Sequence, residues 1–214
     1  LRIAQSYYNA KDDANAIKEF KKYIENYPED PQVGDVVEAM ESAVKRKTAL
    51  TTATAIGTGT ATATATATTS TEGMAISESV ETLKGILEKY PNSKIAGEIQ
   101  YKIGKKHYDD KNYDKAIEEL SKVIVDYPET NSVNMTQFYI GEAYYKLKKY
   151  EEALTSYNRF MQNFPKDEYV IDALFHSATS NYNLKKYKEA ANSYDTIIKK
   201  FPESEFVSAA MFNM

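Results

Sequence analysis

Residues 141–165 read GEAYYKLKKYEEALTSYNRFMQNFP, and most of the chain repeats the spacing of their small residue, alanine and proline. Ala153 follows Gly141 by twelve residues, and Pro165 follows Ala153 by twelve. The prolines that close the later units lie 37 residues apart, at Pro91, Pro128, Pro165 and Pro202. Small residues at fixed positions let two helices approach closely, and a proline cannot continue the helix before it. Each unit therefore reads as a helix, a short turn, a second helix and a proline-containing turn.

The small residue and the alanine recur at the same two positions of most repeats. The small position is held by Ala4, Gly104, Gly141 and Ala178, and the alanine position by Ala16, Ala116, Ala153 and Ala190. This recurrence predicts an all-α fold over residues 1–214. We expect about ten helices in antiparallel pairs, stacked as a right-handed α-solenoid.

One insertion interrupts the period. Pro28 precedes Pro91 by 63 residues, which is 26 more than the period, and residues 48–73 form a tract of that length. Twelve of the 26 residues are Thr and seven are Ala, so the tract lacks the large apolar side chains that would offset ordering entropy. We predict a flexible insertion in the turn between the two helices of the second unit, with an extended ribbon as the alternative. That unit is degenerate, because Glu41 stands at its small position and Ser79 at its alanine position.

Two further expectations concern helix starts and chain ends. A residue suited to N-capping follows each repeat proline by two positions, namely Asp30, Ser93, Thr130, Asp167 and Ser204. Neither end of the sequence carries a polar capping repeat, so we expect a fragment of a longer array.

The small–alanine–proline spacing resembles the tetratricopeptide repeat, whose usual period is about 34 residues. Short sequences such as GEAYY at residues 141–145 and YEEA at residues 150–153 are similar to those in repeats of bacterial envelope proteins of the BamD and Tol-Pal accessory families. The resemblance implies a protein-binding scaffold in a periplasmic, multiprotein envelope assembly.

Composition and motifs argue against several other functions. The chain has no Cys, a net charge of −4 and no long apolar run, which disfavours thiolate chemistry, nucleic-acid binding and a transmembrane helix. His107 and His176 lack the neighbours of a zinc site, and Gly57 and Gly59 lack the rest of a nucleotide-binding loop. We interpret both histidines as packing or surface residues. We therefore predict no catalytic residue, no cofactor, no metal and no enzyme activity.

Lysines gather at the turns within the helix pairs, as in Lys105-Lys106, Lys148-Lys149 and Lys185-Lys186. Aligned repeats would place them along one edge, which would suit a polyanion or a membrane surface. We favour a simpler interpretation, in which they complement the dipoles at helix C-termini.

Aromatic residues form two columns on the first helices. In the tetratricopeptide family the fifth and twelfth positions usually face the concave groove. Here these positions hold the candidate partner-binding residues Tyr101, Tyr108, Phe138, Tyr145, Phe175 and Tyr182. Within a repeat the two positions are seven residues apart and share a helical face. The rings could bind another protein or peptide segment in the groove, or they could pack against the neighbouring repeat.

The same positions exclude a carboxylate clamp of the co-chaperone type, because the Lys and Asn set of that clamp is missing. The leading hypothesis is a non-enzymatic binding scaffold in the bacterial cell envelope. The alternatives are a cytoplasmic adaptor of the same fold and the accessory segment of a larger enzyme.

Overall fold

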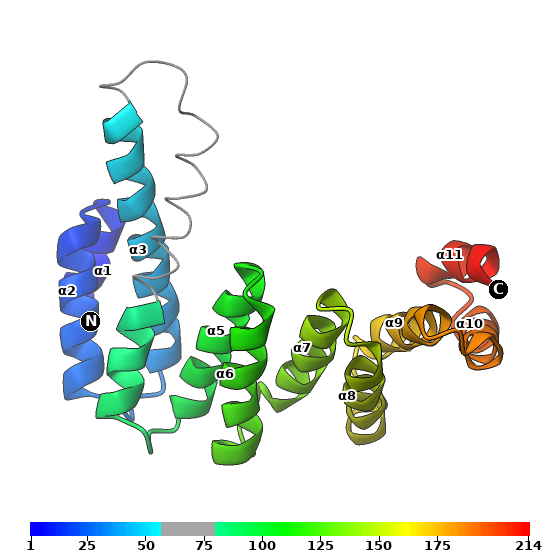
Figure 1. The fold of residues 1–214 in the computed structure, drawn as a ribbon. Helices are drawn as coiled ribbons and strands as arrows, with labels where there is room; N and C mark the ends of the chain where they lie inside the picture. The colour runs from blue at the N-terminus through cyan, green and yellow to red at the C-terminus, as the bar shows by residue number, and fades with distance from the viewer. Residues whose placement is uncertain (57–79) are drawn as a thin grey trace. The chain divides into compact units, whose positions relative to one another are not determined.

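The computed structural model describes the backbone of residues 1–56 and 80–214 and the side chains of residues 1–50 and 80–214 (Figure 1). Every regular element in this part of the chain is a helix. The helices are α1 (Arg2–Asn9), α2 (Asp13–Asn26), α3 (Val33–Ile56), a helix whose described residues are 80–89, α5 (Ala96–Asp109), α6 (Tyr113–Asp126), α7 (Val133–Lys146), α8 (Tyr150–Asn163), α9 (Val170–Asn183), α10 (Tyr187–Lys200) and α11 (Phe206–Asn213). The predicted all-α solenoid of helix pairs is confirmed, while its right-handed sense stays a prediction.

The chain divides into two compact units, Leu1–Lys106 and His107–Met214. In the first unit α2 packs against both α1 and α3. Its core includes Phe20, Met40, Leu83 and Ile103, none of which has measurable exposure. Large apolar side chains from several helices thus meet in one core, and their burial provides the main favourable contribution to stability.

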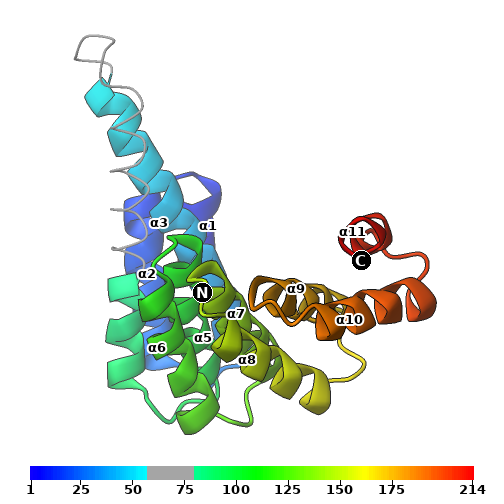
Figure 2. The ribbon, with the colours of Figure 1, turned by 45° about the vertical axis from the view of Figure 1, so that its right-hand side comes forward.

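The second unit repeats one packing pattern along the chain (Figure 2). Helices α7 and α8 form a pair, as do α9 and α10, and each second helix also contacts the first helix that follows it. The first helices touch one another as well, α7 with α9 and α9 with α11. Neighbouring repeats are therefore joined through both of their helices.

The repeated small residues lie where the helices of a pair cross. Ala153 and Ala178 are fully buried, and Gly141 faces the ring of Tyr157 so closely that an added Cβ would lie 2.8 Å from two ring carbons. Glycine at this position lets α7 approach the aromatic ring on α8.

The four short turns within helix pairs in the described part of the chain have the same hydrogen bonds. After α7, the Lys148 N–H donates to the Tyr145 carbonyl and the Lys149 N–H donates to the Tyr144 carbonyl, each at 2.9 Å. This pair of bonds is a Schellman motif, in which one residue adopts the left-handed conformation. That residue is a lysine at every such turn, namely Lys11, Lys111, Lys148 and Lys185, with φ between 59° and 62°.

Asp30 and Asp167, two of the five predicted N-caps, bond within the turn before the helix and not at the helix start, whereas the Ser93 hydroxyl is buried without a hydrogen-bond partner. Helix α9 begins at Val170, three residues after Asp167, and the Asp167 carboxylate accepts the Tyr169 N–H at 3.0 Å. Asp30 accepts the Gln32 N–H in the same way at 2.8 Å. These side chains therefore stabilise the turn that leads into the helix, because the chain makes one more turn after proline before the helix starts.

The structure also corrects where the insertion begins. Helix α3 continues from Val33 to Ile56, so residues 48–56 are helical and not part of a loop. They contain neither Gly nor Pro, and their alanines favour a helix. Residues 57–79 lie outside the described part, so the predicted flexibility of the remaining tract stays a prediction. No helix in the described part is both long and apolar enough to cross a bilayer.

Glu41 stands where other repeats have a small residue, and it forms ion pairs with two lysines of the same compact unit. Its carboxylate lies 3.4 Å from Lys102 Nζ and 3.1 Å from Lys106 Nζ, and the side chain is only 15% exposed. An ionic contact thus occupies the place where other repeats pack a small residue.

Candidate functional site

The fifth-position aromatic residues lie mostly inside the fold. Phe138 is 5% exposed, and its ring centroid lies 4.8 Å from that of Tyr169 and 5.6 Å from that of Phe160. Phe175 is half-buried and stacks on Phe206 at 4.8 Å. Tyr101, in the first unit, is also half-buried. Phe138 and Phe175 therefore join successive repeats.

One of the three twelfth-position tyrosines is exposed. Tyr108 and Tyr145 are half-buried, and Tyr182 is 52% exposed. Each forms an edge-to-face pair with the first residue of its second helix, at centroid distances between 5.4 and 5.9 Å, the partners being Tyr113, Tyr150 and Tyr187. Tyr108, Tyr145 and Tyr182 are called the tyrosine row below.

A planar group from the next first helix covers two members of the tyrosine row. Tyr139 lies edge-to-face on Tyr108 at 5.0 Å, and His176 stacks on Tyr145 at 4.9 Å with an interplanar angle of 19°. Both tyrosines are accordingly half-buried.

In the first unit Arg46 occupies the corresponding place. Its guanidinium lies 4.1 Å from the centroid of the Tyr8 ring and pairs with the Asp13 carboxylate at 2.6 Å. It also donates to the Tyr8 carbonyl at 3.2 Å. Arginine suits this position because its planar cation can bind a carboxylate and lie over a ring at once.

A buried carboxylate on α7 organises the polar interior of the second unit. Glu142 accepts hydrogen bonds from Tyr157 Oη and from His176 Nδ1, both at 2.5 Å, and from Tyr108 Oη at 3.3 Å. Its side chain is 8% exposed. The three partners come from α5, α8 and α9, so one carboxylate bridges three successive repeats.

The electrostatics of this network follow from burial and hydrogen bonding. Burial by itself would raise the pKa of Glu142, but the hydrogen bonds and charge of His176 together with the Tyr157 hydroxyl outweigh it and lower the pKa. Burial and the nearby carboxylate raise the pKa of Tyr157 and of Tyr108. Glu142 therefore stays ionised and the tyrosines stay protonated donors, as a structural network requires.

The next repeat holds an uncharged version of the same network. Thr179 replaces Glu142 and Tyr194 replaces Tyr157, both 37 residues later, and their hydroxyl oxygens lie 3.2 Å apart. The charge of Glu142 is therefore not required by the repeat itself.

The sequence did not predict this network. The sequence predicts His176 as a packing or surface residue and indicates no role for Glu142. A signal existed, since Tyr108 precedes Glu142 by 34 residues and Glu142 precedes His176 by 34. That separation is three residues short of the period, and both contacts join neighbouring first helices.

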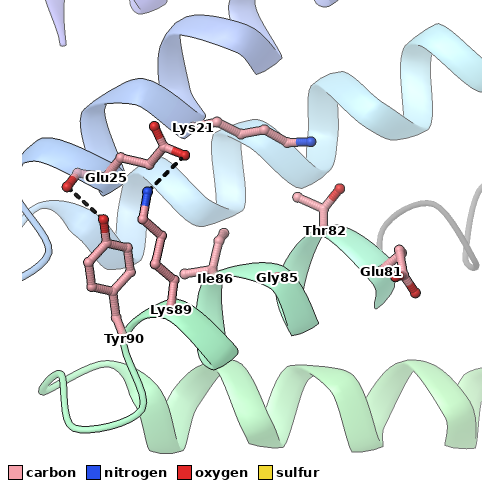
Figure 3. A pocket seen from close by; sticks show the side chains of 8 residues that line it. All are labelled: Lys21, Glu25, Glu81, Thr82, Gly85, Ile86, Lys89 and Tyr90. Carbon is pink, nitrogen blue, oxygen red and sulfur yellow. Dashed lines mark hydrogen bonds and ion pairs between the residues drawn. The ribbon is translucent and has the colours of Figure 1, made fainter.

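A separate pocket lies in the first unit between α2 and the helix at residues 80–89 (Figure 3). Tyr90 Oη donates to the Glu25 carbonyl at 2.7 Å, and Lys89 Nζ lies 3.3 Å from the Glu25 carboxylate. Gly85 presents no side chain to this space, and nothing lies within 4 Å of where its Cβ would be. The pocket is therefore a gap between helices that surface contacts bridge at one end.

The described residues contain no cluster of three or more His, Asp or Glu side chains that could hold a metal ion. His107 lies in α5 and is half-buried. Glu142 and His176 are the pair that most resembles a catalytic acid and base. The Glu142 carboxylate, however, is buried and already accepts hydrogen bonds from three donors. The arrangement is suited to holding repeats together and not to proton transfer with a substrate.

Comparisons with known proteins agree with this architecture. Residues 97–214, more than half of the chain, match the family described as outer membrane lipoprotein, YfiO, and residues 1–30 match a tetratricopeptide repeat family. No curated protein matches the sequence.

Solved structures share the fold at low sequence identity. A tetratricopeptide repeat protein from Parabacteroides merdae is 13% identical with a TM-score of 0.60, covering 99% of this chain and 70% of that one. MamA from Desulfovibrio magneticus is 16% identical with a TM-score of 0.58, covering 95% of this chain and 94% of that one. The chain is thus a tetratricopeptide repeat protein, and it belongs to the YfiO family of outer membrane lipoproteins.

Proposed function

We propose that this chain is a non-enzymatic scaffold that binds another protein within a multiprotein assembly of the bacterial cell envelope. Family membership supports the envelope location, and the helix-pair architecture supports protein binding. A cytoplasmic adaptor and an accessory segment of a larger enzyme are the competing functions.

The observation that carries the proposal is the exposure of Tyr182 in the tyrosine row. Tyr182 is 52% exposed, whereas Phe138 is 5% exposed, and Tyr108, Tyr145 and Phe175 are half-buried. We place the partner on the tyrosine row, whereas Phe138 and Phe175 pack between successive repeats.

Tyrosine suits this role for physical reasons. Its ring offers a large apolar contact area with few rotatable bonds, and its hydroxyl can bond to a partner's backbone. The edge-to-face pairs with Tyr113, Tyr150 and Tyr187 restrict the rings before any partner arrives, which reduces the entropy lost on binding.

The test is site-specific photo-cross-linking in intact cells. A photoreactive phenylalanine analogue at Tyr182 should cross-link to an envelope protein. The same analogue at Val125, which is 76% exposed on the second helix α6, provides the control at an exposed site away from the tyrosine row.

Equal cross-linking at both positions would contradict binding at the tyrosine row. Fractionation of the same cells tests the location, because a chain found only with the cytoplasmic fraction would favour the adaptor function instead.

A further inference from the structure

Three turns of the second unit share a conformation that lysine rarely adopts. Lys111, Lys148 and Lys185 have φ of 59°, 60° and 62°, and each is the left-handed residue of a Schellman motif. Glycine is the usual residue there, because a side chain is strained in this conformation. All three lysines are nevertheless exposed, so packing does not explain the choice of residue.

The neighbouring lysines have a different role. Lys149 Nζ lies 3.1 Å from the Asp114 carboxylate, and Lys186 Nζ lies 2.9 Å from the Glu151 carboxylate. Each pair joins one repeat to the next, so the three turns lie side by side along one edge of the unit. Within the described residues no ion pair involves Lys111, Lys148 or Lys185.

An aromatic pair lies at the same edge. Tyr182 and Tyr187 flank Lys185 in sequence, are 52% and 57% exposed, and have ring centroids 5.4 Å apart. Lys188, also exposed, follows directly. Exposed tyrosine beside lysine is typical of surfaces that meet the headgroup region of a bilayer, where the ring is amphipathic and the ammonium finds phosphate.

We propose that Lys111, Lys148 and Lys185, here called the turn lysines, form an edge that binds anionic phospholipid headgroups. The turn lysines project from successive helix ends, so they can meet an extended surface together. Lysine binds phosphate as a point charge and needs no fixed bidentate geometry. An acidic protein segment is the other occupant to test. Tyr182 also belongs to the tyrosine row, but this proposal rests on the turn lysines and its test does not involve the protein partner.

The structure supplies well-matched variants. In the test variant Lys111, Lys148 and Lys185 are each replaced by Asn, which tolerates the left-handed conformation better than lysine and should preserve the fold. In the control variant Lys149→Gln and Lys186→Gln remove two lysines from the same turns but leave the turn lysines in place. Melting curves of both variants check that the helices remain folded.

The measurement is co-sedimentation of the full chain with vesicles. The probes are phosphatidylcholine vesicles that contain phosphatidylglycerol and vesicles of phosphatidylcholine alone. The wild-type chain should bind only the anionic vesicles, and less as salt rises. Each lysine near an anionic surface contributes about fivefold in affinity, so the triple Asn variant should bind roughly a hundredfold more weakly. The control variant should lose much less.

Three outcomes would overturn the proposal. The first is equal binding to both kinds of vesicle, and the second is a triple Asn variant that binds as the wild type does. The third is a wild-type chain that binds polyglutamate but no vesicle, which would assign the edge to an acidic protein segment.

Discussion

Replacing Tyr157 with Phe tests whether Glu142 is the centre of a charged network that joins repeats. Tyr157 has no measurable exposure, and its hydroxyl lies 2.5 Å from the Glu142 carboxylate. Phenylalanine keeps the ring and its packing, so the change removes one hydrogen bond and creates no large cavity. Tyr194→Phe is the matched control, because Tyr194 is 1% exposed and its hydroxyl meets only the neutral Thr179 hydroxyl at 3.2 Å.

The expected magnitudes differ because the two acceptors differ. A hydrogen bond to a charged group contributes about 1.5–3 kcal/mol to stability, and one between neutral groups about 0.5–1.5 kcal/mol. Tyr157→Phe should therefore lower the free energy of unfolding by about 1 kcal/mol more than Tyr194→Phe does. For a chain of this size each kcal/mol corresponds to about 2–4 °C in melting temperature.

The assay is urea unfolding followed by circular dichroism, with a thermal melt of each variant. Helical content before unfolding should be unchanged in both. Equal losses for the two variants would refute the idea that the carboxylate strengthens the bond. If Tyr157→Phe leaves the free energy of unfolding unchanged, then the hydrogen bonds from His176 and Tyr108 alone satisfy the Glu142 carboxylate.

Four further substitutions test three other features of the structure. Gly141→Ala should destabilise the fold by about 1–3 kcal/mol, because the added Cβ would overpack against Tyr157. Gly85→Ala has open space at its Cβ and should stabilise the fold by about 1 kcal/mol. Chemical unfolding of both variants measures the two changes. Because Glu142 has a pKa below the ordinary value of 4.5, its contribution to stability is present above that pH and lost as the pH falls through the lowered pKa. Melting temperatures of the wild type should therefore fall faster in that acidic range than those of Glu142→Gln, and parallel curves would contradict this. Ser180→Ala should stabilise the chain by about 1 kcal/mol, since the Ser180 hydroxyl is buried without a hydrogen-bond partner; a lower melting temperature would show that the hydroxyl is satisfied.

Much of the fold was predictable because its signals are local and repeated. Gly141, Ala153 and Pro165 mark one helix pair, and the recurrence of that spacing every 37 residues predicts the stack without any knowledge of contacts. Helix ends were less predictable. The chain after each proline makes an extra turn before the helix begins, and α3 continues to Ile56 because no glycine or proline stops it earlier.

For the candidate site, the sequence predicted which residues occupy the fifth and twelfth positions of the first helices but not how exposed each one is. Sequence spacing placed Phe138 and Tyr182 among the six expected partner-binding residues, but it could not tell a buried ring from an exposed one. That difference depends on the side chains that surround each ring in space, from its own repeat and from the next one. Tyr169 and Phe160 enclose Phe138, whereas Tyr182 keeps half of its surface exposed.

The sequence by itself determined the helix-pair unit, its period and the all-α class, because small residues, alanine and proline act within one repeat. Only the tertiary structure decided that Glu142, Tyr157 and His176 meet, since they belong to three different helices and come together when the repeats stack. The physical reason is the range of the interactions. Helix formation and chain reversal depend on neighbours in sequence, whereas burial and the pKa of a carboxylate depend on neighbours in space.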